Sequence, residues 1–172
     1  MNKSYSNSGL SMMEAVVYIA IFAFLFVLVV NVLITMSGSF AELERFRQVT
    51  TGGALGLERI AREARDAVSI NTSLSTFGSN PGILVLNTVD EDEEVHTVRF
   101  YGSGGTLYVQ LDSASAERLT GDDVAVSNLV FRNLSSTESD AVKIELQVHS
   151  QRGAREISIP FYDTIVLRGS YE

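Results

Sequence analysis

The chain has 172 residues, which is enough for one small domain together with a membrane segment. It contains no cysteine, but a domain of this size can fold around a hydrophobic core without disulfides. The 13 Lys and Arg residues are outnumbered by 21 Asp and Glu, and the formal net charge is -8. Because nucleic-acid binding depends on clustered basic side chains, we expect no direct nucleic-acid contact.

The most apolar stretch lies near the N-terminus, from Ala15 to Ile34. Only Tyr18 and Asn31 are notably polar among its 20 residues. At about 1.5 Å per residue, a helix of this length is roughly 30 Å long, which matches the hydrocarbon core of a bilayer. The apolar residues occupy all sides of the helix. This favours lipid or a fully buried position over a surface helix.

Glu14 stands at the entry of this stretch. A charge in a membrane costs free energy, on the order of 2.5–3.5 kcal/mol for a central Asp and less near an end. The position leaves two interpretations open, a partner charge or a side chain that lies among the lipid headgroups. A cleaved signal peptide and an uncleaved plain anchor fit the pattern less well, because Lys3 is the one basic side chain before the apolar core.

The helical pattern continues beyond the apolar stretch. Apolar residues keep a spacing of three or four, first at Phe40, Leu43, Phe46 and Val49, and then at Leu57, Ile60, Ala61, Ala64, Ala67 and Val68. We therefore predict one long helix from about Ser11 to Ser69. Gly38 and the Gly52-Gly53 pair are weak points, because each Gly costs a helix roughly 1 kcal/mol relative to Ala. Two interpretations stay open: the glycines mark a linker or break, which their helix penalty slightly favours, or they are a place where the helix melts or bends on entering a filament.

The composition changes after Asn71, where a loop-like segment at 71–82 precedes a series of strands. The predicted strands are Ile83–Thr88, Val95–Tyr101, Thr106–Leu111, Val124–Phe131, Ala141–His149 and Glu156–Phe161. Residues 142–148 alternate between apolar and polar, so one face of that strand should be buried. Turns at 102–105 and 150–154 predict hairpins. The fold class is therefore α+β: a long N-terminal α-helix, whose first half spans a membrane, packed on an antiparallel β-sheet head.

The residues at the start of the apolar stretch resemble a known processing site. Gly9-Leu10-Ser11-Met12-Met13-Glu14, followed at once by the apolar run, is similar to the cleavage motif of type IV prepilins and type II secretion pseudopilins. In that family, prepilin peptidase cuts after the Gly and methylates the new N-terminus, and the fifth mature residue is Glu. The resemblance implies cleavage between Gly9 and Leu10 and N-methylation of Leu10. It also implies that Glu14 forms an assembly salt bridge with the N-terminal amine of a neighbouring subunit.

The resemblance further implies an organisation: a leader at 1–9, a transmembrane or filament-core helix at 10–36, the second half of the helix at 37–70 and a β-rich head at 71–172. It implies a single-pass inner-membrane protein with its head outside the cytoplasm, and a cell-surface or periplasmic filament after assembly. The implied partners are other pilin or pseudopilin subunits, prepilin peptidase, the inner-membrane assembly platform and, before assembly, membrane lipid.

The helix at 57–63 and the order of the head strands are similar to those of minor subunits. This similarity implies a minor pilin or minor pseudopilin that initiates, caps or decorates a filament. An adhesion or DNA-uptake binding module is the alternative.

We expect no enzymatic activity and no cofactor, because no catalytic constellation or phosphate-binding loop is recognisable. The acidic run from Asp90 to Glu94 is interpreted as a solvated hairpin turn. It lacks the D-x-D-x-D-G pattern of the best-known Ca²⁺ loop, and we predict no metal site. His96 and His149 are interpreted as ordinary strand residues.

Overall fold

The computed structural model describes residues 11–90, 93–136, 139–151 and 157–168 of the chain. Gly9 and Leu10, the predicted positions of cleavage and methylation, lie outside these residues. The chain divides into two compact units, residues 1–43 and residues 44–172. The N-terminal unit is helical over its described residues from Met12 onward, and the second unit contains the rest of the helix and every strand of the described residues.

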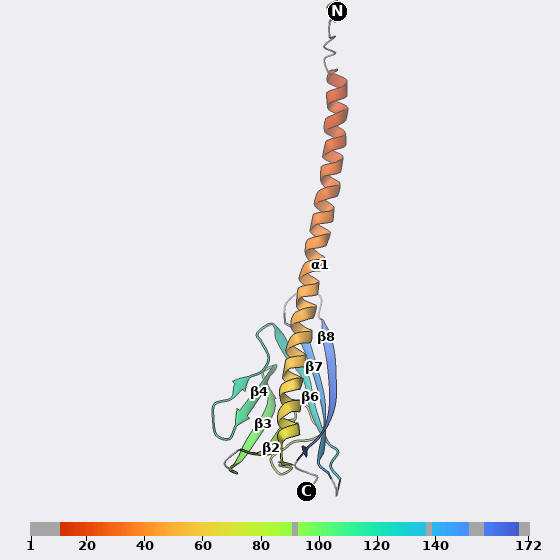
Figure 1. Cartoon of the computed structure of the whole chain (residues 1–172). Coiled ribbons are helices and arrows are strands. Elements are labelled where there is room, and N and C mark those ends of the chain that lie inside the picture. The colour runs from red at the N-terminus through yellow and green to blue at the C-terminus, as the bar shows by residue number, and fades with distance from the viewer. Residues whose placement is uncertain (1–10, 91–92, 137–138, 152–156, 169–172) are drawn as a thin grey trace, which may run out of the picture. The chain divides into compact units, whose positions relative to one another are not determined.

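Helix α1 runs without interruption from Met12 to Asp66 (Figure 1). The prediction of one long N-terminal helix is confirmed, and of the two interpretations of the glycines the linker or break is excluded here, because the helix continues through Gly38 and Gly52-Gly53. A Cβ atom at Gly53 would lie 2.7 Å from Cζ of Phe161, and one at Gly52 would lie 3.3 Å from Cγ2 of Val124. The Gly52-Gly53 pair therefore allows the helix to approach the strands closely.

The helix ends at Asp66 rather than near Ser69 because the next residues pair with a strand. The backbone N–H of Val68 donates to the carbonyl oxygen of Asn87 at 2.8 Å. Strand β1 (Ser69–Ile70) then pairs antiparallel with β2 (Ile83–Val89). Competition from these strand hydrogen bonds ends the helix before its apolar pattern ends.

The first sheet has five antiparallel strands in the order β1-β2-β3-β4-β5. Its remaining strands are β3 (Val95–Ser103), β4 (Thr106–Leu111) and β5 (Glu117–Arg118). The strands predicted at 83–88, 95–101 and 106–111 are confirmed, and the first two are slightly longer than predicted. Strands β1 and β5 were not predicted, because two residues are too few to show a period of two.

The second sheet has three antiparallel strands in the order β6-β7-β8: β6 (Val124–Asn133), β7 (Ala141–Ser150) and β8 (Ser158–Val166). The alternation predicted for 142–148 is confirmed, because the apolar residues of β7 are buried and the polar ones between them are half-buried. The last strand continues to Val166, beyond its predicted end at Phe161. Asp163 and Thr164 interrupt the apolar pattern, yet they pair with Ile144 and Lys143.

Strand β6 has a register shift between Val126 and Asn128. The side chain of Asn80 supports this irregularity: its amide donates to the carbonyl of Ser127 at 3.2 Å, and its oxygen accepts the N–H of Leu129 at 2.9 Å. The loop that carries Asn80 therefore satisfies backbone groups along β6, where an open strand edge would invite pairing with another chain.

The core of the second unit lies between α1 and the two sheets (Figure 1). The helix contributes one stripe of buried residues, namely Val49, Gly53, Gly56, Ile60, Ala61 and Ala64. The largest fully buried side chains of the sheets come from both of them, and they include Phe100, Leu107, Phe131, Ile144 and Leu146. The prediction of an α+β fold with the helix packed on antiparallel strands is thus confirmed, with the strands divided between two sheets.

Candidate functional site

The N-terminal part of α1 is one candidate site, because its apolar side chains are exposed. The most apolar window of 18 residues has a mean hydropathy of 3.0, and none of it is buried within the protein. Exposed fractions of 72 % for Phe22 and 65 % for Phe24 are typical of this segment. Helix α1 is therefore long and apolar enough to cross a membrane, in agreement with the sequence.

Hydroxyl groups in this part of the helix find acceptors on the helix itself. The Thr35 hydroxyl donates to the carbonyl of Asn31 at 2.9 Å, and the Ser39 hydroxyl donates to the carbonyl of Thr35 at 3.2 Å. Such bonds reduce the cost of placing a polar side chain in lipid or in an apolar helix bundle. They explain why an otherwise apolar helix tolerates these residues.

Glu14 lies exposed in the first turn of α1. Its carboxylate accepts a hydrogen bond from the Tyr18 hydroxyl, with 3.1 Å between the oxygens. Within the described part of the chain, this is the carboxylate's only hydrogen bond or ion pair. Glu14 is also the only charged residue between positions 11 and 41. The helix dipole favours an acid in the first turn but does not neutralise it.

The sequence pattern predicted no role for Tyr18 beyond that of a polar interruption in the apolar stretch. Its separation from Glu14 is four residues, which places both side chains on the same helix face. That spacing was visible in the sequence and was the available signal for this contact.

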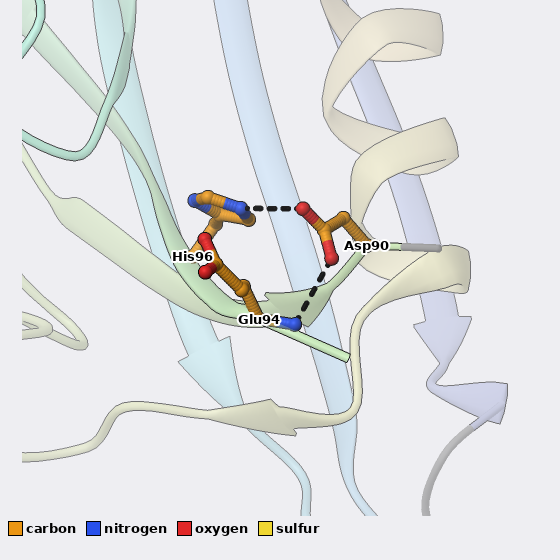
Figure 2. A group of neighbouring side chains, drawn as sticks. All are labelled: Asp90, Glu94 and His96. Carbon is orange, nitrogen blue, oxygen red and sulfur yellow. Dashed lines mark hydrogen bonds and ion pairs between the residues drawn. The ribbon is translucent and has the colours of Figure 1, made fainter. Parts of the chain in front are cut away.

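A second group of side chains surrounds His96, near the start of β3 (Figure 2). The Nε2 atom of His96 lies 3.0 Å from Oδ2 of Asp90, which follows β2. Its Nδ1 atom lies 2.8 Å from Oδ2 of Asp112, which follows β4. The other Asp112 oxygen accepts the Thr97 backbone N–H at 2.6 Å. The histidine thus joins two chain segments that the sequence separates.

The electrostatics of this group favour the charged forms. The Asp112 carboxylate first, and then that of Asp90, raises the pKa of His96 by hydrogen bonding. The pKa of Asp112 is lowered, chiefly by the Thr97 backbone N–H and then by His96. His96 is therefore more than the ordinary strand residue predicted. The pairing of β3 with β4 brings Asp112 to it, and no local sequence pattern indicates that contact.

The described residues of the acidic run, Asp90, Glu93 and Glu94, are exposed between β2 and β3, as expected of a solvated turn. One ligand atom from each of Asp90, Glu94 and His96 lies within 4.8 Å of the others. Hydrogen bonds within the protein account for this grouping: Asp90 Oδ1 accepts the Glu94 backbone N–H at 2.9 Å, and His96 lies between two carboxylates. We assign no metal to these residues.

His149 lies on β7 opposite Ala125 and Ser158, as predicted for a strand residue. Its Nδ1 atom is buried without a hydrogen-bond partner. Among the described residues no charged group is bonded to its ring, and this distinguishes it from His96.

Comparison with known proteins gives no relative from which a function can be transferred. No family model, no curated protein and no solved structure matches the chain.

Proposed function

We propose that this chain is a minor structural subunit of a type IV pilus or type II secretion pseudopilus. In this proposal it is processed between Gly9 and Leu10 and assembles through α1. The observation that carries the proposal is Glu14: a lone acid in the first turn of an exposed apolar helix, with no cation bonded to it in the described part of the chain.

Cleavage after Gly9 would create an α-amino group at Leu10, close in sequence to Glu14. In a bundle of such helices the acid and the new amine of a neighbouring subunit would both be buried in an apolar core. Breaking a buried ion pair by removing one partner costs about 3–5 kcal/mol, because the other charge stays buried and unpaired. The pair would therefore select one axial register between neighbouring helices.

Exposed apolar residues beyond the bilayer length give independent support. A membrane anchor needs about 20 apolar residues. On α1, large apolar side chains remain at least half exposed past Ile34, at Met36, Phe40, Leu43, Phe46 and Leu55. The charged residues Glu42 and Arg45 lie among them, so a bilayer core is a poor environment for this part of the helix. Contact with the helices of neighbouring subunits would cover it.

The first experiment tests processing. The full chain is co-expressed with an active prepilin peptidase, and the product is analysed by intact mass spectrometry. We expect loss of residues 1–9 and addition of one methyl group at Leu10. The matched control is Gly9→Leu, which should stay uncut at the same expression level. An uncut wild-type chain alongside a processed control prepilin would refute this part of the proposal.

The second experiment tests assembly. Glu14→Ala should insert into the membrane and be processed normally, yet its amount in sheared filaments should fall roughly a hundredfold or more, given the cost of an unpaired buried charge. The matched control is Glu58→Ala. Glu58 is another exposed acid of α1, and it lies beyond both the apolar run and the exposed apolar residues that end at Leu55. Equal filament incorporation of both variants would contradict the proposed role of Glu14.

A further inference from the structure

The second sheet has one covered edge and one open edge. Along β6, other parts of the chain bond to the backbone: the N–H groups of Gly78 and Gly82 donate to the carbonyls of Phe131 and Leu129 at 2.9 Å and 2.7 Å. The opposite edge is β8, the outermost strand of this sheet (Figure 1). Within the described part of the chain, no backbone group bonds to the outer side of β8. Such an edge is a template for strand addition by another chain.

The hydrogen bonds at the two ends of the β7–β8 pair show which residues of β8 face outward. The Ser150 N–H donates to the Ile157 carbonyl at 2.9 Å, and the Leu167 N–H donates to the Asp140 carbonyl at 3.0 Å. The register between these ends is continuous. Because backbone groups alternate in direction along an antiparallel strand, the odd-numbered residues of β8 bond to β7 and the even-numbered residues point away from it. The outward residues are Ser158, Pro160, Tyr162, Thr164 and Val166.

Two of these five outward residues have no N–H to offer another chain. Pro160 lacks the backbone N–H altogether. The N–H of Thr164 already donates to Oδ1 of Asp163 at 2.8 Å. The two positions flank Tyr162, so an approaching strand would find a donor at every second outward residue. We propose that Pro160 and Asp163 protect the open edge of β8 against pairing with another chain.

The charge of Asp163 opposes strand addition as well. Asp163 lies on the inner face of β8, the face whose residues Phe161 and Ile165 belong to the core. Its side chain is 34 % exposed, and the cation paired with it, Arg65 of α1, lies 3.9 Å away. A strand added beside β8 would cover this carboxylate, and burial of a charge without a close partner costs free energy. Natural edge strands carry prolines and inward-pointing charges that prevent such pairing.

Protection of β8 matters most when copies of the chain are close together. Copies that assemble through α1 hold their heads at a high local concentration, and this is the condition in which open edges pair. An edge that resists pairing leaves the helix as the surface through which copies meet. Protection of β8 depends neither on cleavage after Gly9 nor on the ion pair proposed for Glu14, so failure of either leaves it unaffected.

Thiol cross-linking of the full chain in detergent micelles tests the proposal. The chain has no cysteine, so Tyr162→Cys places a single reporter at the middle of the outer edge, where the native side chain is 65 % exposed. Ser113→Cys, at an exposed position after β4, measures the cross-linking of copies that merely share a micelle. With the native Pro160 and Asp163, both reporters should form the same small amount of dimer with a short bifunctional maleimide.

Removal of the protection should change the reporter on β8 alone. In Pro160→Thr/Asp163→Ala, dimer formed through position 162 should rise about tenfold or more, because two hydrogen-bond donors return to each edge, and dimer formed through position 113 should stay constant. Pro160→Thr and Asp163→Asn alone should give smaller rises, and they decide the test if the double variant loses its near-UV circular dichroism. Unchanged cross-linking at position 162 in the folded variants would overturn the proposal. So would cross-linking at position 162 that exceeds that at position 113 before either residue is changed.

Discussion

Gly53 is the position at which the contact between α1 and β8 can be tested most directly. A Cβ atom added there would lie 2.7 Å from Cζ and 2.9 Å from Cδ2 of Phe161, closer than carbon atoms pack. The Phe161 ring is half-buried and packs against the core, so it cannot turn away without losing other contacts. Gly53→Ala should therefore destabilise the second unit although Ala is the better helix former.

The two effects can be compared. Overpacking of a core costs about 1–3 kcal/mol. Ala in place of Gly in a helix contributes about 1 kcal/mol in the opposite direction. The expected net loss is therefore about 1 kcal/mol, which corresponds to a fall in melting temperature of roughly 2–4 °C for a protein of this size. At Gly52 the nearest atom is Cγ2 of Val124 at 3.3 Å, so Gly52→Ala should be neutral or stabilise by up to about 1 kcal/mol.

The assay is thermal unfolding of the full chain in detergent, followed by the near-UV circular dichroism of tyrosine. Four of the six tyrosines lie in residues 44–172, so the signal reports mainly on the second unit. The double variant Gly53→Ala/Phe161→Leu should be about 1 kcal/mol more stable than the sum of the two single changes predicts, as expected for residues in contact. If Gly53→Ala and Gly52→Ala have equal stability, the close approach does not explain why α1 has glycine at position 53.

Two further predictions concern the sheets. Arg132 first, and then Lys143, lowers the pKa of Glu145 to about 2. The Glu145 contribution to stability should therefore be present above the ordinary pKa of 4.5 and be lost as the pH falls toward 2. Carbon NMR of the carboxyl groups measures the Glu145 pKa, and a midpoint near 4.5 would contradict the ion pairs. Phe100→Ala should cost about 3–5 kcal/mol in denaturant unfolding, because the Phe100 side chain is fully buried. Val95→Ala, at an exposed position of the same strand, should cost less than about 0.5 kcal/mol. Similar losses in both variants would argue against a core that contains Phe100.

The sequence was sufficient for features that depend on local periodicity. An apolar run with one acid at its start determines a membrane-length helix whatever the rest of the chain does, because its side chains exceed what one face of a helix can bury. The alternation along 142–148 likewise determined a strand with one buried face. These patterns repeat every two or about 3.6 residues, so each can be recognised within a short window of sequence.

Tertiary structure decided the features that depend on residues distant in the chain. The helix penalty of glycine is local and suggested a break at Gly52-Gly53. The reason for Gly53 is the Phe161 ring, more than 100 residues away in the sequence. The role of His96 depends in the same way on the register of β3 with β4, which brings Asp112 to its ring. A local pattern specifies which face of an element is apolar, but only the folded chain determines which side chain meets that face, because those contacts form when distant segments close on a shared core.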